Sequence, residues 1–150
     1  MIGGISGMSG GYGVKTMSGA SARMPAAGKM ANLFNQIIRD PFRPDVASAT
    51  LFLCEGALAT SGDCERGFEI GERRFSHILN PLKGWPVEGL ASISVAASSC
   101  LATGLAASIA MLEGEGAGEY LASIGFENLT IDHDGRLGGS IAAKILSSAT

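Results

Sequence analysis

The pattern of apolar and polar positions changes its period in the second half of the chain. Residues 91–97 (ASISVAA) alternate apolar and serine positions, which predicts a strand with one buried face. From Ser98 or Ser99, either of which can cap a helix, apolar residues recur at helical spacing: Leu101, Leu105, Ile109 and Leu112. The residues between them are small, so the predicted helix over residues 99–112 can lie close against a sheet.

Shorter patterns predict the other elements of the second half. Residues 49–54 and 74–79 are rich in strand-forming residues and end at turn signals, and residues 129–137 form a hairpin around an Asp-His-Asp-Gly turn. A short helix is predicted over residues 116–124, and two prolines make residues 40–45 a loop. Strands and helices mix without regular βαβ alternation, which predicts an α+β fold, a mixed sheet with packed helices.

The beginning of the chain is the least regular part. Residues 1–36 are rich in Gly, Ser and Ala, and we separate them from an α+β domain over residues 37–150. Within the first segment, residues 14–27 predict a short, poor helix that Gly19 and Pro25 interrupt.

Composition narrows the possible partners. The 150 residues suit one domain with one core, and 46% of them are apolar. A formal net charge of -3 with scattered Lys and Arg residues argues against nucleic acid. The three cysteines include no C-x-x-C pair and form no disulfide framework.

Neither a membrane span nor an export signal is expected from the sequence. Residues 89–112 carry no charge, but they are mostly Ala, Ser, Gly and Thr, so a membrane span is unlikely. No signal peptide is recognisable at the beginning of the chain, which makes the cytoplasm the default expectation.

Three sequence stretches carry a resemblance to one family. Residues 59–66 read ATSGDCER, residues 76–87 read SHILNPLKGWPV, and residues 91–114 have the pattern of a strand, a turn and a helix. They resemble the motifs A-T-S-G-D-Y-E-R, H-I-L-D-P-x-T-G-x-P and A-D-A-L-A-T-A-L-F-V-L-G of the FAD:protein FMN transferase (ApbE) family. The order and spacing are the family's, and together the matches cover most of residues 37–137.

The resemblance implies the fold of the C-terminal half of that family. It also implies an enzyme that binds FAD, cleaves its pyrophosphate with Mg²⁺, and attaches FMN to a Thr or Ser of an acceptor protein. FAD and such an acceptor are therefore the expected partners, and the oligomeric state is left open. Family members usually act outside the cytoplasm. The G-G-D loop of the family is missing here, as is everything the family has upstream.

By resemblance, the metal ligands of the family fall on three positions. The Asp of the D-A-L-A-T helix falls on Gly104, its Thr falls on Ser108, and a backbone carbonyl ligand falls on Ser9. Mg²⁺ prefers carboxylate and phosphate oxygens, and Gly104 supplies no side chain. We therefore expect Mg²⁺ to bind feebly.

The N-terminal flavin contacts of the family fall on residues 4–15, which resemble D-L-S-G-I-G-K-G-Y-A-V-D. Gly11 and Tyr12 keep the small and aromatic positions of this motif and are candidate cofactor-binding residues. Gly4 stands at the position of the flavin-binding Asp, and Gly10 at that of the motif Lys. The resemblance therefore implies weakened flavin contacts here.

The middle motifs supply the other candidates. His77 keeps the motif histidine, which the resemblance places at the flavin and metal site; a solvated strand-end histidine is the alternative. Ile78 is its cofactor-binding neighbour. Thr60 and Ser61 form either a phosphate-binding turn or a plain turn between two strands. Asn80 replaces the motif Asp and can still close an Asx-turn.

Three further residues have ordinary interpretations. Asp63 is expected to be solvated or locally paired. His133, between two aspartates, is expected at a solvated hairpin tip rather than in a metal site. Trp85 is expected to cover one edge of the core.

Two hypotheses of function follow. The first is an FMN transferase family member, truncated, with weak or no activity, in which His77 is the catalytic residue. The second is a non-catalytic remnant, a weak flavin-binding or interaction module. The glycine at position 104 and the missing G-G-D loop favour the second hypothesis.

Overall fold

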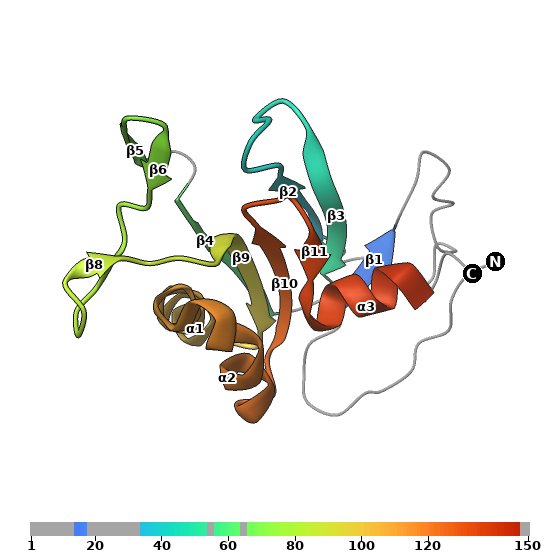
Figure 1. The fold of residues 1–150 in the computed structure, drawn as a ribbon. Helices are drawn as coiled ribbons and strands as arrows, with labels where there is room; N and C mark the ends of the chain where they lie inside the picture. The colour runs from blue at the N-terminus through green and yellow to red at the C-terminus, as the bar shows by residue number, and fades with distance from the viewer. Residues whose placement is uncertain (1–13, 18–33, 54–55, 64–65, 148–150) are drawn as a thin grey trace, which may run out of the picture.

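The computed structural model describes residues 14–17, 34–53, 56–63 and 66–147 (Figure 1). These residues form an α+β fold with a four-stranded sheet, a three-stranded sheet and two small two-stranded sheets. The predicted fold class is confirmed. No helix in the described ranges is both long and apolar enough to cross a membrane.

The four-stranded sheet is antiparallel and includes the strands of two motif segments, residues 59–66 and residues 91–114. Its order is β11-β10-β9-β4, with β11 at Leu137–Gly138, β10 at Glu127–Asp132, β9 at Leu90–Ala97 and β4 at Ala57–Gly62. The strand over residues 91–97 is therefore confirmed, as is the hairpin that follows it. The expectation of one buried face is wrong. Ser92 and Ser94 are buried as fully as their apolar neighbours, because both faces of β9 are covered.

One face of this sheet is covered by two helices. Helix α1 spans Cys100–Glu113, a 3₁₀ turn follows at Gly114–Gly116, and α2 spans Ala117–Ser123. Ser99 caps α1, with its Oγ accepting from Ala102 N at 3.5 Å. Both predicted helices are confirmed, and the chain changes from strand to helix at the predicted serines.

Helix α1 packs mostly small residues inward, together with Met111. The buried positions are Thr103, Ala106, Ala107, Ala110 and Met111. Leu101 and Leu105, which helped to locate the helix, are 73% and 56% exposed. The spacing of these two leucines thus marks the outer face, and the small residues of the inner face allow close approach to β4 and β9 (Figure 1).

The opposite face of the sheet meets a second layer. The three-stranded sheet has the order β1-β3-β2, with β1 at Val14–Met17, β3 at Ala47–Leu53 and β2 at Phe34–Arg39. Helix α3, at Gly139–Ser147, contacts β10 and β1. A second core joins both sheets and this helix through Ile38, Ala49, Leu51, Leu129, Ile131, Ile141 and Ala142.

This layer corrects one prediction at the beginning of the chain. The poor helix predicted over residues 14–27 is wrong where it can be examined, because Val14–Met17 is a strand paired with β3. Residues 18–27 lie outside the described part. The proposed division between residues 36 and 37 falls inside β2 and stays a prediction.

Two small hairpins follow β4 along the chain. Strands β5 (Phe68–Ile70) and β6 (Arg73–Phe75) form one, and β7 (Leu79–Asn80) and β8 (Trp85–Pro86) form the other. The single strand predicted over residues 74–79 is therefore wrong. Ser76 ends it, because its Oγ accepts from Ile78 N at 3.1 Å and turns the chain. Trp85 is half-exposed and meets Phe75 edge to face.

Candidate functional site

The outer face of α1 carries two of the predicted metal-ligand positions. Gly104, which is half-buried at the edge of this face, and the exposed Ser108 lie one turn apart, as the i, i+4 spacing requires. A Cβ at Gly104 would meet no atom within 4 Å. Ser108 is exposed, and its Oγ donates to Gly104 O at 3.0 Å. The helix therefore brings both positions together but presents no negative charge there.

This donor set does not fit Mg²⁺. A magnesium ion requires close oxygen ligands, usually with one or two carboxylates among them, and the pair offers a single hydroxyl that already serves the helix backbone. Within the described ranges, no group of three or more His, Cys, Asp or Glu residues could hold a metal ion. The third predicted position, Ser9, lies outside the described residues.

His77 lies in the bend between β6 and β7. Its side chain is exposed. The bend is held because Val87 N donates to Ile78 O at 2.9 Å, and Asn80 Oδ1 accepts from Leu82 N at 2.9 Å. The predicted Asx-turn at Asn80 is thus confirmed. Ile78 packs against the core beneath α1, so the motif holds the exposed imidazole on a fixed segment.

Thr60 and Ser61 lie in a strand. Both belong to β4, opposite Ser94 and Ile93 of β9, so neither kind of predicted turn is formed there. Thr60 Oγ1 and Ser94 Oγ are 2.7 Å apart and share a hydrogen bond. Because Ser61 pairs with Ile93, which packs beneath α1, Thr60 faces the other side of the sheet from α1.

A charged corner forms where three strands of the sheet end. Asp63 follows β4 and is only 2% exposed, so the expectation of a solvated carboxylate is wrong. His133, at the tip of the β10–β11 hairpin, places its Nε2 3.9 Å from Asp63 Oδ2. Burial raises the pKa of the Asp63 carboxyl, and electrostatic attraction from the neighbouring His133 and Arg74 side chains opposes that shift. The tip histidine is therefore paired rather than simply solvated.

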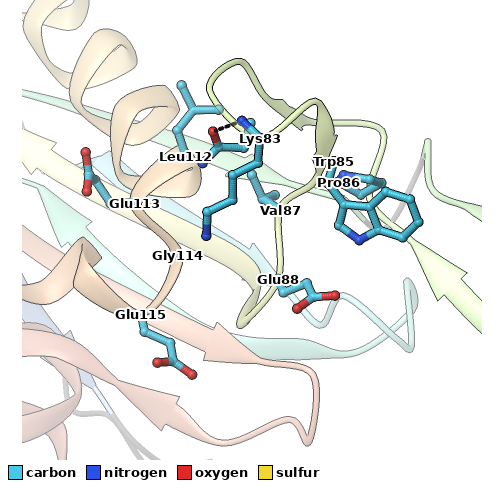
Figure 2. Close-up of a pocket in the computed structure, with 10 residues that line it drawn as sticks. Lys83, Trp85, Pro86, Val87, Glu88, Leu112, Glu113, Gly114 and Glu115 are labelled. Carbon is cyan, nitrogen blue, oxygen red and sulfur yellow. Dashed lines mark hydrogen bonds between the residues drawn. The ribbon is translucent and has the colours of Figure 1, made fainter.

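A cavity of about 350 Å³ lies beside the H-I-L-N-P segment (Figure 2). It opens between the β7–β8 hairpin and the end of α1, and the ammonium end of Lys83 extends toward Gly114. Glu88, Glu113 and Glu115 also line it. Three carboxylates against one ammonium make this cavity a poor receptor for a pyrophosphate.

The remaining predicted residues cannot be placed. Gly11 and Tyr12 lie outside the described residues. Sequence reasoning also missed the pairing of Asp63 with His133. Asp63 belongs to the motif over residues 59–66, and His133 belongs to the predicted hairpin over residues 129–137. The two residues are 70 positions apart, and only the order of β4, β9 and β10 brings them together.

Comparisons with known proteins bear on the family and the fold of this chain. The ApbE family model matches residues 21–130. A FAD:protein FMN transferase from Rhodobacter capsulatus is 40% identical over 78 residues, which are 52% of this chain and 15% of that protein. The crystal structure of the ApbE protein from Thermotoga maritima matches with a TM-score of 0.67 and 25% identity, over 76% of this chain and 38% of that one.

The chain belongs to the ApbE family, because the family model covers more than half of it. It spans well under half the length of each of these two relatives.

Proposed function

We propose that this chain contributes to an FAD:protein FMN transferase site, and that by itself it transfers FMN weakly or not at all. The observation that carries the proposal is the outer face of α1. By resemblance, the family's metal-ligand pair falls on Gly104 and Ser108, which lie one turn apart in this helix and carry no carboxylate. FAD and an acceptor protein with a Thr or Ser are the substrates that family membership suggests.

In the proposed reaction, the acceptor hydroxyl oxygen bonds to the FMN phosphorus of FAD. The bond from that phosphorus to the bridging oxygen breaks, and AMP leaves with the bridging oxygen. The hydroxyl proton needs an acceptor, and His77 is the candidate because its imidazole is exposed on a fixed bend. We derive no step through a metal, since the described residues do not fit one.

Charge neutralisation is what the described site lacks. Phosphoryl transfer depends mainly on positioning and on stabilising the negative charge of the phosphates. Neither the hydroxyl of Ser108 nor the acid-lined cavity beside Lys83 provides that stabilisation. We therefore expect little turnover even where flavin binds.

The test incubates the chain with FAD, Mg²⁺ and a Thr-bearing acceptor protein, and mass spectrometry measures FMN on the acceptor. The Rhodobacter capsulatus enzyme in the same assay serves as the positive control. We expect no adduct with this chain. A clear adduct that disappears in His77→Ala would overturn the proposal of weak activity.

A parallel measurement separates a poor enzyme from a protein with no flavin site. Quenching of FAD fluorescence is followed with and without Mg²⁺. We expect weak quenching that Mg²⁺ changes little. Absence of quenching at millimolar protein would count against any flavin site in the isolated chain.

A further inference from the structure

The outer face of α1 is apolar and carries no charge along most of its length. Leu101, Leu105 and Ile109 are exposed there, and no residue from Leu101 to Leu112 is charged. The helix is held in the fold by its buried side, through contacts with β4, β9 and α2 (Figure 1). Single apolar residues are ordinary on a protein surface, but a continuous row along one helix indicates a contact with another surface.

The spacing of this face suits pairing with a second helix. Leu101, Leu105, Ser108 and the half-buried Leu112 are separated by four, three and four positions, which is the spacing of the contact positions of a coiled coil. Gly104 borders this row, and a Cβ built there would meet no atom within 4 Å. The backbone of a second helix can therefore approach α1 closely beside Gly104.

The charges at the ends of α1 favour an antiparallel pair of two copies. The helix ends at the exposed Glu113, Glu115 follows, and the first turn contains no acidic residue. A carboxylate is unfavourable at the C-terminus of its own helix and favourable near the N-terminus of another. Antiparallel pairing places Glu113 of each copy beside the first turn of the other copy's helix. Parallel pairing would instead bring the acidic ends of both copies together.

The β7–β8 hairpin extends this surface beyond the end of α1. Together with Leu112 and Glu113, the hairpin lines the cavity beside the helix end (Figure 2). At the turn of the hairpin, Leu82 is 95% exposed. Leu82 and Leu101 are the two most exposed large apolar side chains in the described part of the chain. Antiparallel pairing brings the hairpin of one copy to the first turn of the other copy's α1, where Leu101 lies.

We propose that the chain forms a symmetric dimer in which the outer faces of two α1 helices pack antiparallel. Leu101 then lies opposite Leu112 of the partner subunit, and Leu105 lies opposite Ser108 of the partner subunit. A helix of 14 residues is about 21 Å long, and its contact is smaller than the roughly 800 Å² per partner of a stable interface. We therefore expect a weak dimer, with a dissociation constant on the order of 100 µM. The pairing is independent of FMN transfer, because it needs neither flavin nor metal.

Sedimentation equilibrium tests the proposal on the unmodified chain, from low micromolar to millimolar concentration. We expect a monomer at the low end of this range and a dimer at the high end. A chain that stays monomeric throughout would overturn the proposal and leave the outer face of α1 to a different partner.

A charged substitution locates the contact. Leu105→Glu places two carboxylates close to the two-fold axis, and we expect it to weaken dimerisation about tenfold or more. The matched control is Ile37→Glu, which changes another exposed apolar residue, on β2. This variant should dimerise as the unmodified chain does. Equal losses in the two variants, or a loss in Ile37→Glu alone, would show that the contact is not made by α1.

A mixture of two variants tests the direction of the pair. Ser108→Lys also changes an exposed residue of α1, and alone it should weaken dimerisation by like-charge repulsion. In the antiparallel dimer, position 105 of one copy lies opposite position 108 of the other. Leu105→Glu mixed with Ser108→Lys should therefore associate more tightly than either variant alone. A mixture that associates no better than its components would refute the antiparallel arrangement. Circular dichroism of each variant confirms that the helix content is unchanged, and unchanged dimerisation in Ser108→Lys would count against the contact by itself.

Discussion

The outer face of α1 and the charged corner at Asp63 differ in the charge that they carry. The helix keeps its position in the fold and carries no charge at the ligand pair, Gly104 and Ser108. The corner keeps a buried carboxylate beside a histidine and an arginine. A helix is positioned by its inner face, so its outer face can lose a ligand without cost to the fold.

The residues of the charged corner, by contrast, cannot be replaced without affecting the fold. The backbone of Asp63 holds three segments together: its N–H donates to Ala91 O at 3.1 Å, and its carbonyl accepts from Gly67 N and Arg74. Its carboxyl is buried as a consequence of that position. Buried charge is costly unless it is paired, so the state of the Asp63 carboxyl bears directly on the stability of the fold.

The largest effect is expected when one side chain on each face of α1 is shortened to alanine. Met111 is 1% exposed on the inner face, and Met111→Ala should lower the free energy of unfolding by about 2–5 kcal/mol. Leu105→Ala on the outer face should lower it by less than about 1 kcal/mol. Urea unfolding of both variants measures the difference. Equal losses would show that the outer face is packed after all.

Placing a carboxylate at position 104 should affect metal binding next most strongly. In Gly104→Asp the new carboxylate shares a face with the Ser108 hydroxyl, and open space surrounds it. We expect the affinity for Mg²⁺, measured by calorimetry, to rise about tenfold or more.

The control for this variant adds the same charge elsewhere on the helix. Leu101→Asp places a carboxylate seven residues from Ser108, roughly 10 Å along the axis. It should not raise the affinity for Mg²⁺. A similar gain in both variants would mean that the ion responds to charge alone rather than to the geometry of the pair.

These differences explain what the sequence could predict about the fold. Where one pattern dominates, as in the change from alternating serines to a helix at Ser99, the predicted elements are confirmed. The errors arise where distant contacts decide. Val14–Met17 is a strand because it pairs with β3, and the run over residues 74–79 is divided by a local bond of the Ser76 hydroxyl.

The candidate site was predictable to the same extent. Motif spacing placed Gly104 and Ser108 on one face of a helix, since that relation is local. It could not show that Thr60 faces away from α1, which depends on pairing with β9. Nor could it join Asp63 to His133, because that contact depends on the order of three strands.

The corner also predicts a pH dependence. Because burial raises the folded-state pKa of Asp63 above its unfolded value, protonated Asp63 stabilises the fold below the unfolded pKa, and this stability is lost as pH rises through the folded pKa. Asp63→Asn should therefore match the unmodified chain in acid and exceed its stability at neutral pH. Chemical unfolding from pH 4 to pH 7 measures the gap, which should widen with pH.

The reverse result would be equally clear. A gap that narrows or changes sign as pH rises would mean that the attraction of His133 and Arg74 for the carboxylate outweighs its burial. A stability gain in Asp63→Asn at neutral pH would instead show that burial of the carboxylate lowers the stability of the fold.

The smallest effect is expected at Ser108. Ser108→Ala removes an exposed hydroxyl whose bond to Gly104 O lies within the helix, and alanine is the better helix former. The free energy of unfolding should therefore change by no more than about 0.5 kcal/mol, and toward greater stability. In the Gly104→Asp background, however, the same change should abolish much of the gained Mg²⁺ affinity, because the hydroxyl would then be a ligand. Calorimetry on the single and double variants gives the coupling between the two positions. If the hydroxyl proves irrelevant in both backgrounds, positions 104 and 108 do not bind a metal ion together.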